Sequence, residues 1–263
     1  MRKRNCALVV MLVGGSMVMG CGDDAVPATV TLELQVMSFE PGEDQKAVPG
    51  AEVCVLGTDD CDVGDDDGRV SLQLPANEES AVMITAEGFN PTLSPQVTED
   101  VDLTGRQAVV LSESVAQALS TILGIDYPLT DFGVIAITTL VPPLDDPNNG
   151  IPGITYTLVD GAGQRYYLNE NGIPQTELAA TTAPLGTGGF IEVTSSVYEI
   201  SLGGTASNCT PVAAWAGDSA SSIRLPVEAG FFTDAYLACD PINATPGPRP
   251  SDSTPSCKHR PRR

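Results

Sequence analysis

An acidic segment between Cys54 and Arg69 carries the densest set of side chains with chemical potential in the sequence. Six aspartates fall within nine residues there: Asp59, Asp60, Asp62, Asp65, Asp66 and Asp67. Carboxylate oxygens are the hard ligands that Ca²⁺ prefers. The spacing does not fit an EF-hand loop, because no register combines its acidic positions with its glycine and its final glutamate. We favour a hydrated acidic turn, and the alternative is a Ca²⁺ site built from Asp62, Asp65 and Asp67.

Five aromatic residues could stack against sugar rings on a binding surface: Tyr166, Tyr167, Trp215, Phe231 and Phe232. Aromatic residues make up only 5% of the chain, so folded cores must use most of them. Trp215 lies between two cysteines in the sequence, and we expect it to pack on a disulfide. A sugar-binding platform is the alternative interpretation.

Histidine is nearly absent, which removes most hydrolytic chemistry. The single histidine is His259, close to the end of the sequence, so a zinc peptidase lacks its imidazole ligands and a Ser-His or Cys-His pair lacks its base. Paired carboxylates of a glycosidase stay open, because acidic residues are abundant and their separation cannot be read from sequence. The sequence predicts no catalytic residue, no cofactor other than the Ca²⁺ considered above, and a protein that is not an enzyme.

The N-terminus has the layout of a secretory signal peptide. Arg2, Lys3 and Arg4 precede an apolar run and small residues that end at Gly20, and the run is too short to span a bilayer. Val18-Met19-Gly20-Cys21 resembles the bacterial lipobox, which implies cleavage after residue 20 and a lipid on Cys21. Gly22 is not the aspartate that acts as an inner-membrane retention signal in enteric bacteria, which favours the outer membrane.

The charge of the chain excludes one class of partner. Removal of Arg2, Lys3 and Arg4 with the signal peptide leaves 10 basic residues against 34 acidic ones, a net charge of −24. A field of that sign repels phosphate groups, so we expect no nucleic-acid partner. We expect the protein to contact the membrane through the lipid anchor on Cys21.

Four cysteines predict two disulfides. Cys6 leaves with the signal peptide and Cys21 carries the lipid, and Cys257 is the odd residue near the C-terminus. In an oxidising envelope we expect Cys54 to pair with Cys61 and Cys209 to pair with Cys239, one bond in each half of the chain.

Short segments of alternating polarity indicate β-strands throughout the chain. In the first half they are 29–37, 52–56, 69–74, 81–86 and 107–111, and in the second half 133–139, 154–159, 189–193, 198–202, 222–227 and 231–239. Turn residues such as Pro49-Gly50 and Asp67-Gly68 separate them.

One segment changes to helical periodicity. Apolar residues recur at helical spacing between Ser112, a candidate N-cap, and Gly124, a candidate stop: Val115, Ala118, Leu119, Ile122 and Leu123. We expect this helix to pack its apolar stripe against a sheet. Residues 241–263 hold proline, serine and five basic residues, and we expect them to be disordered.

The first half resembles a known domain family. Pro49-Gly50-Ala51-Glu52-Val53, Asp67-Gly68-Arg69-Val70-Ser71-Leu72-Gln73-Leu74-Pro75 and Gly88-Phe89-Asn90-Pro91 resemble landmarks of the carboxypeptidase regulatory-like domains, which are prealbumin-like sandwiches. The resemblance covers roughly residues 28–112 and carries over no catalytic residue. Pro152-Gly153 followed by Gly186-Thr187-Gly188-Gly189-Phe190 repeats the theme loosely. The cysteine-containing variant is similar to surface lipoproteins of myxobacteria.

Together these observations predict an all-β protein of two tandem prealbumin-like or Ig-like antiparallel β-sandwiches joined by a short α-helix. The predicted organisation is a signal peptide at 1–20, a tether at 21–27, a first sandwich at 28–112, a helical linker at 113–127, a second sandwich at 128–240 and a basic tail at 241–263. We expect a non-enzymatic cell-envelope lipoprotein that serves as a surface interaction, adhesion or spacer module and binds an envelope protein or glycan. The alternative is a carbohydrate-binding or Ca²⁺-dependent adhesin module.

Overall fold

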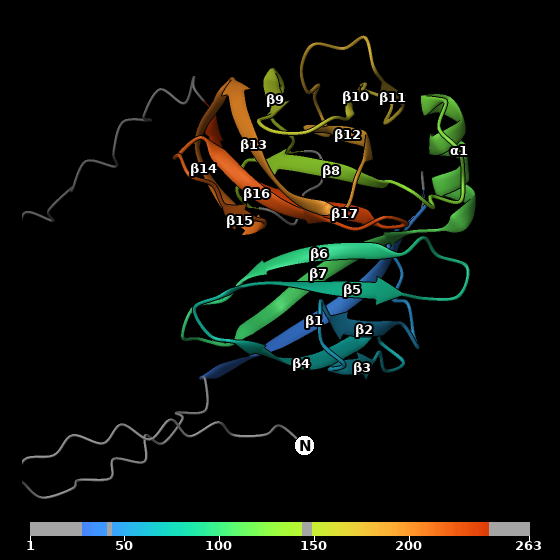
Figure 1. Cartoon of the computed structure of the whole chain (residues 1–263), viewed down its shortest axis with the longest axis vertical. Coiled ribbons are helices and arrows are strands. Elements are labelled where there is room, and N and C mark those ends of the chain that lie inside the picture. Colours follow the sequence, from blue (N-terminus) through green and yellow to red (C-terminus); the bar gives the residue numbers. More distant parts are fainter. Residues whose placement is uncertain (1–27, 41–43, 144–148, 242–263) are drawn as a thin grey trace, which may run out of the picture.

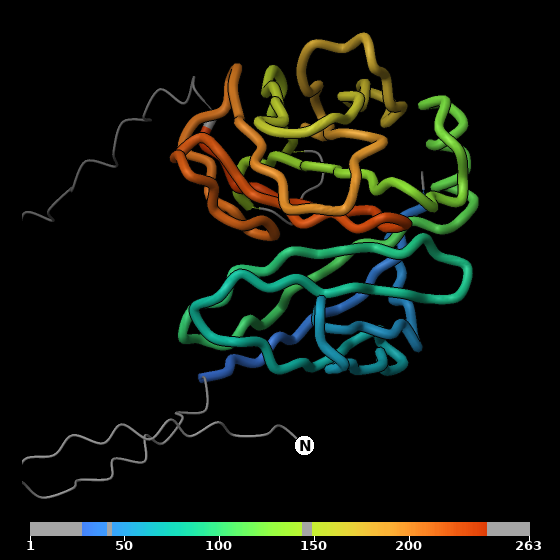
Figure 2. The backbone as a smooth tube through the Cα atoms, in the orientation of Figure 1, coloured from blue at the N-terminus to red at the C-terminus, as the bar shows by residue number. Residues whose placement is uncertain are grey.

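The computed structural model describes residues 28–40, 44–143 and 149–241 (Figure 1). The predicted signal peptide, the lipidation site Cys21, the thiol of Cys257 and residues 242–263 lie outside the described residues. The chain forms two β-sandwiches stacked one above the other, and Figure 2 shows the path of the backbone from the lower one to the upper one.

The first sandwich contains seven strands: β1 (Thr29–Phe39), β2 (Glu52–Val55), β3 (Cys61–Val63), β4 (Arg69–Pro75), β5 (Glu79–Thr85), β6 (Thr92–Val97) and β7 (Leu103–Leu111). β1 shows why they form, because its residues are buried and exposed almost in strict alternation, as a strand with one core-facing side requires. The sheet β4-β1-β7 packs on β3-β2-β5-β6 around apolar residues that include Leu32, Leu34, Leu74 and Ile84.

Helix α1 (Glu113–Leu123) follows β7 directly. The side chain of Ser112 accepts a hydrogen bond from the backbone N–H of Val115, and Gly124 ends the helix in the left-handed conformation, φ 73°, so both predicted ends are confirmed. The buried side differs from the predicted stripe. Val115 is buried, but Ile122 is 52% exposed, because the helix lies at one edge of the upper sandwich rather than flat on a sheet (Figure 1).

The second sandwich contains ten strands: β8 (Gly133–Leu140), β9 (Ile154–Leu158), β10 (Gln164–Leu168), β11 (Pro174–Gln175), β12 (Thr187–Val193), β13 (Ser196–Gly204), β14 (Ala206–Ala213), β15 (Trp215–Ala216), β16 (Ser222–Val227) and β17 (Phe232–Pro241). The sheet β15-β16-β13-β9 faces strands β11-β10-β12-β8-β17 across a core that includes Ile137, Tyr156, Tyr167, Ile200, Leu225 and Leu237. The predicted all-β sandwich architecture is confirmed.

The two sandwiches share one sheet, which the prediction of tandem units did not include. The order β11-β10-β12-β8-β17-β6-β5-β2-β3 runs from the upper sandwich into the lower one through β17 and β6. Three strand pairs are parallel rather than antiparallel: β1 with β7, β17 with β8 and β17 with β6. The last strand of the fold therefore lies in the middle of its largest sheet.

Candidate functional site

Two of the three carboxylates of the predicted Ca²⁺ site, those of Asp62 and Asp65, accept hydrogen bonds from the backbone. Asp62 accepts the N–H of Val63 at 2.9 Å and the N–H of Ser71 at 2.8 Å through its two oxygens. Oδ1 of Asp65 accepts the N–H groups of Asp67 at 2.9 Å and Arg69 at 2.8 Å. These bonds hold the connection between β3 and β4, as short aspartate side chains do in turns.

The structure does not gather the proposed Ca²⁺ ligands. Among the described residues, the one group of three candidate ligand atoms within 4.8 Å of one another belongs to Glu52, Cys54 and Cys61. The two sulfur atoms of that group are joined in a disulfide, so they offer no thiolate to a metal. A Ca²⁺ site at Asp62, Asp65 and Asp67 stays a prediction.

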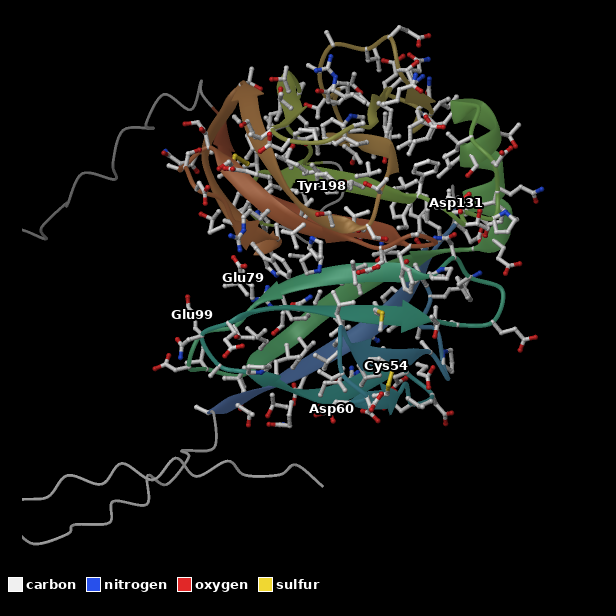
Figure 3. The ribbon with its side chains drawn as sticks, viewed as in Figure 1. Cys54, Asp60, Glu79, Glu99, Asp131 and Tyr198 are labelled. Carbon is white, nitrogen blue, oxygen red and sulfur yellow. A yellow bond between two sulfur atoms is a disulfide. The ribbon has the colours of Figure 1, made fainter. Side chains whose placement is uncertain are left out.

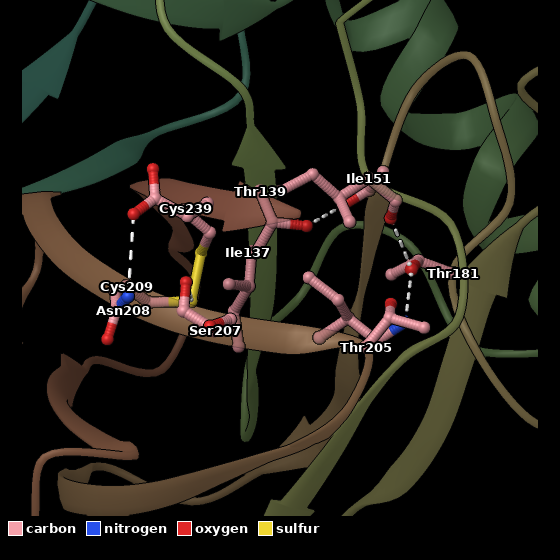
Figure 4. The surroundings of a disulfide bond; sticks show 12 residues. Ile137, Thr139, Ile151, Thr181, Thr205, Ser207, Asn208, Cys209 and Cys239 are labelled. Atoms are coloured by element: carbon pink, nitrogen blue, oxygen red, sulfur yellow. Dashed lines mark hydrogen bonds between the residues drawn. A yellow bond between two sulfur atoms is a disulfide. The ribbon is translucent and has the colours of Figure 1, made fainter. Parts of the chain in front are cut away.

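Both predicted disulfides are present. Cys54 and Cys61 are directly opposite each other on β2 and β3, and Figure 3 shows the bond in the lower sandwich. Cys209 on β14 is bonded to Cys239 on β17, beside the contact between Asn208 and Asp240 (Figure 4). Each sandwich therefore has one covalent link between neighbouring strands.

The aromatic residues considered as a sugar platform lie in the interior. Tyr166, Tyr167 and Trp215 are 4%, 0% and 7% exposed, and Phe231 and Phe232 are partly buried against apolar clusters. A ring that stacks on a sugar must present a face to solvent, so these five side chains do not form a surface platform in this structure.

Trp215 packs between the sandwiches, which corrects the expectation that it packs on a disulfide. Its ring lies in a cluster with Ala81 and Leu93, flanked by Leu56, Met83 and Phe231. The indole N–H donates to the carbonyl oxygens of Ser80 at 2.8 Å and Gln96 at 3.1 Å, both in the lower sandwich. Sequence reasoning missed this contact because its partners are more than a hundred residues away.

Two further contacts connect the sandwiches beside the Trp215 cluster: the Arg224–Glu79 ion pair and the pairing of β6 with β17. We call these three features together the junction. Arg224 lies opposite Trp215 in the β15–β16 pair and forms an ion pair with Glu79 of β5, which Figure 3 labels at the boundary between the two halves. β17 joins β6 where Thr233 lies opposite Leu93. The junction thus combines apolar, ionic and backbone contacts.

A buried carboxyl lies next to this strand pairing. Asp234 follows Thr233 on β17 and is 9% exposed. Burial raises the pKa of Asp234 to about 7, and its hydrogen bond with Tyr236 lowers the pKa to a smaller extent. Burial also raises the pKa of Tyr166, with a further contribution from the charge of Asp234.

Two clefts lie on the described surface. A cleft of about 460 Å³ is lined by Pro152, Asn169, Glu170, Thr181, Thr182 and Ala183. A second cleft of about 240 Å³ lies between the end of α1 and β11. In the second cleft the hydroxyl of Thr176 donates to the carboxylate of the adjacent Glu177 at 3.2 Å, at an exposed position. None of the helices in the described part of the chain is long and apolar enough to cross a membrane.

The fold defines the protein as an all-β chain of two fused sandwiches. No protein-family model matches the sequence, and no curated protein is similar to it in sequence. Among solved structures, the Bacillus anthracis TIE protein is similar over 80% of this chain, with 13% identity and a TM-score of 0.24. This chain spans only 34% of that protein, about a third of its length.

Two pilin structures are also similar. The minor pilin GBS52 of Streptococcus agalactiae matches 83% of this chain and 99% of its own, with 9% identity and a TM-score of 0.27. The shaft pilin SpaA of Lactobacillus rhamnosus GG matches 82% of this chain and 98% of its own, with 8% identity and a TM-score of 0.23. TM-scores this low describe a loose correspondence between arrangements of β-strands.

Proposed function

We propose that this protein is a non-enzymatic lipoprotein of the cell envelope whose two fused sandwiches act as a surface interaction, adhesion or spacer module. The junction carries this proposal. Domains joined by a flexible linker move relative to each other unless a substantial apolar interface holds them. Here Trp215, the β6–β17 pairing and the Arg224–Glu79 ion pair all connect the halves. A body of fixed internal orientation suits a module that presents a surface at a set distance from its attachment.

The proposed anchor is supported by the sequence around Cys21 and by the direction in which the chain enters the fold. β1 begins on the side of the lower sandwich that faces away from the upper one (Figure 1). A lipid on Cys21 would therefore place the lower sandwich nearer the membrane and the upper sandwich farther out.

The family assignment of residues 28–112 as a carboxypeptidase regulatory-like domain belongs to the same proposal. Its landmark glycines have backbone roles, which is how such landmarks act in a sandwich. Gly50 and Gly68 have φ values of 72° and 71°, and a Cβ on Gly68 would press against the carbonyl oxygen of Val36 in β1. These positions favour glycine for steric reasons.

Two measurements test the proposal in cells. Labelling with a palmitate analogue should mark the wild-type protein and not Cys21→Ser, which should accumulate as the uncleaved precursor. Equal labelling and equal processing of both would overturn the anchor.

Site-specific photo-crosslinking tests the module role. A crosslinker at Val197, which is 51% exposed on the upper sandwich, is compared with one at Val63, which is 59% exposed on the lower sandwich. A discrete envelope adduct from Val197 supports an interaction or adhesion role, and no adduct from either site supports a spacer. Turnover of an envelope substrate by the purified mature chain would overturn the non-enzymatic assignment.

A further inference from the structure

The position of Asp234 in the shared sheet is unusual. The edge of β17 that faces away from β8 is divided between two strands: β6 pairs with Phe232 and Thr233, and β14 pairs from Tyr236 onward. Asp234 and Ala235 lie between these two registers. The carboxyl group is thus buried at the point where the lower sandwich ends and the upper one continues.

The side chain of Asp234 faces the side of the sheet opposite the main upper core. Cross-strand partners place Tyr166 of β10, Gly189 of β12, Ala136 of β8 and Asp234 in one row. Gly189 and Ala136 have little or no side chain. Tyr166 spans them, and its hydroxyl donates to the carbonyl oxygen of Ile135 at 3.2 Å. The row therefore leads from an aromatic ring to a carboxyl within an apolar layer.

The groups around Asp234 supply no positive charge. Tyr236 on β17 and Tyr166 on β10 are the titratable side chains that interact with it. Arg165 of β10 lies over the ring of Tyr167, on the other face of the sheet. The apolar layer on this face is covered by Leu123, Ile125 and Leu129, and the charged side chain within residues 123–129 is the exposed carboxylate of Asp126. Ionisation of Asp234 would bury a negative charge that the hydrogen bond with Tyr236 offsets only in part, which is costly in an apolar layer.

We propose that the junction is a proton-dependent latch, closed while the Asp234 carboxyl is protonated and loosened when it ionises. The route is short. Asp234 adjoins Thr233, Thr233 lies opposite Leu93 of β6, and Leu93 contacts Trp215 in the junction cluster. Separation of β6 from β17 admits water to the carboxylate, and it disturbs the surroundings of Trp215 at the same time.

The direction with pH follows from linkage. An aspartate in an unfolded chain has a pKa of about 3.9, whereas burial holds the pKa of Asp234 at about 7. The closed form therefore binds the proton more tightly than an open form does. The stabilisation that the protonated Asp234 gives the closed form over the open form is complete below about pH 4, and it is lost as the pH rises through about 7. The ionised fraction rises from about 1% at pH 5 to about 99% at pH 9.

The sole tryptophan of the chain is the reporter. Fluorescence emission and acrylamide quenching of the full mature chain are measured from pH 5 to pH 9, together with Asp234→Asn, which mimics the protonated carboxyl. Asp131→Asn is the matched control at an exposed position. We expect wild type and Asp131→Asn to shift to the red and to be quenched at least twofold more strongly above a midpoint near pH 7. Asp234→Asn should keep the low-pH spectrum throughout.

Two results would overturn the latch: a wild-type spectrum that does not change with pH, or a transition that persists in Asp234→Asn. If the variant does not fold, the carboxyl carbon of Asp234 is titrated by NMR in the wild-type protein. A midpoint near pH 7 that coincides with the tryptophan transition supports the proposal. A midpoint below pH 5 overturns it.

Discussion

The indole nitrogen of Trp215 lies 2.8 Å from the carbonyl oxygen of Ser80 and donates a hydrogen bond to it across the junction. The carbonyl oxygen of Gln96 accepts from the same N–H at 3.1 Å, and Ser80 and Gln96 are opposite each other on β5 and β6. One buried side chain of the upper sandwich therefore bonds to two strands of the lower one.

Replacement of this indole should weaken the whole fold. Trp215→Phe removes the donor from two buried carbonyl groups and should lower the free energy of unfolding by about 1–3 kcal/mol. Trp215→Ala also leaves a cavity and should cost about 3–5 kcal/mol. Urea unfolding followed by circular dichroism measures both. Phe132→Leu, at a 41% exposed aromatic, is the control, and an equal loss there would contradict the assigned role.

The ion pair between Arg224 and Glu79 should contribute little to stability. Both side chains are 36% exposed, and pairs at such positions are typically worth under about 1 kcal/mol. A double-mutant cycle with Glu79→Gln and Arg224→Gln measures the coupling energy by chemical denaturation. A coupling above about 2 kcal/mol would show that the ion pair, rather than the Trp215 cluster, dominates the junction.

The two disulfides should differ in their effect on stability. They enclose sequence separations of 7 and 30 residues, for which loop-closure entropy predicts roughly 2 and roughly 4 kcal/mol. Paired alanine variants, Cys54→Ala with Cys61→Ala and Cys209→Ala with Cys239→Ala, are compared by thermal unfolding. Cys239 is 1% exposed, so its replacement should also lose packing. The reverse order of stabilities would contradict the prediction.

Added Ca²⁺ should leave the melting temperature nearly unchanged. Asp62 and Asp65 already accept backbone N–H groups, and stabilisation by a ligand vanishes when its Kd far exceeds its concentration. Calorimetry of the mature chain with and without millimolar Ca²⁺ measures the effect. A rise of several degrees that disappears in a variant with Asp65→Asn and Asp67→Asn would establish the Ca²⁺-dependent alternative.

Asp65 should matter for the turn itself. Its Oδ1 accepts two backbone N–H groups, so Asp65→Ala should lower the free energy of unfolding by about 1–2 kcal/mol. Asp66→Ala, the adjacent exposed aspartate, is the matched control and should change it by less than about 0.5 kcal/mol. Chemical denaturation compares the two, and equal effects would show that the hydrogen bonds of Asp65 do not stabilise the turn.

Local patterns were sufficient to predict much of the fold. Alternation identified strands such as β1, β4 and β16, and the capping residues Ser112 and Gly124 marked both ends of α1. The pairing of the four cysteines also followed from their number and spacing. Each of these signals depends on neighbours within a few tens of residues.

β6 was missed because its burial comes from the other half of the chain. Pro91 precedes the strand and Pro95 lies within it, and proline in such a run argues against a strand. Its polar residues Thr92 and Ser94 lie opposite Ile84 and Val82, on the side of the first core, while Leu93 faces Trp215. The upper sandwich explains this reversed polarity, because it covers the outer face of β6.

The junction and the burial of Asp234 were not predicted for the same reason, because both depend on contacts between distant parts of the chain. Nothing near Trp215 in the sequence points to Ser80 or Gln96. Asp234 is buried beside Ala136 of β8, which lies about 100 residues earlier in the chain.

The central position of β17 also constrains the order in which the molecule can fold. Its partner β8 lies about 100 residues earlier in the chain, a separation whose closure is entropically costly and slow. During synthesis from the N-terminus, β6 and β8 each keep one edge without its partner strand until β17 has been made. The lower sandwich can form early, whereas the upper sandwich and the connection between them are completed together in one late step.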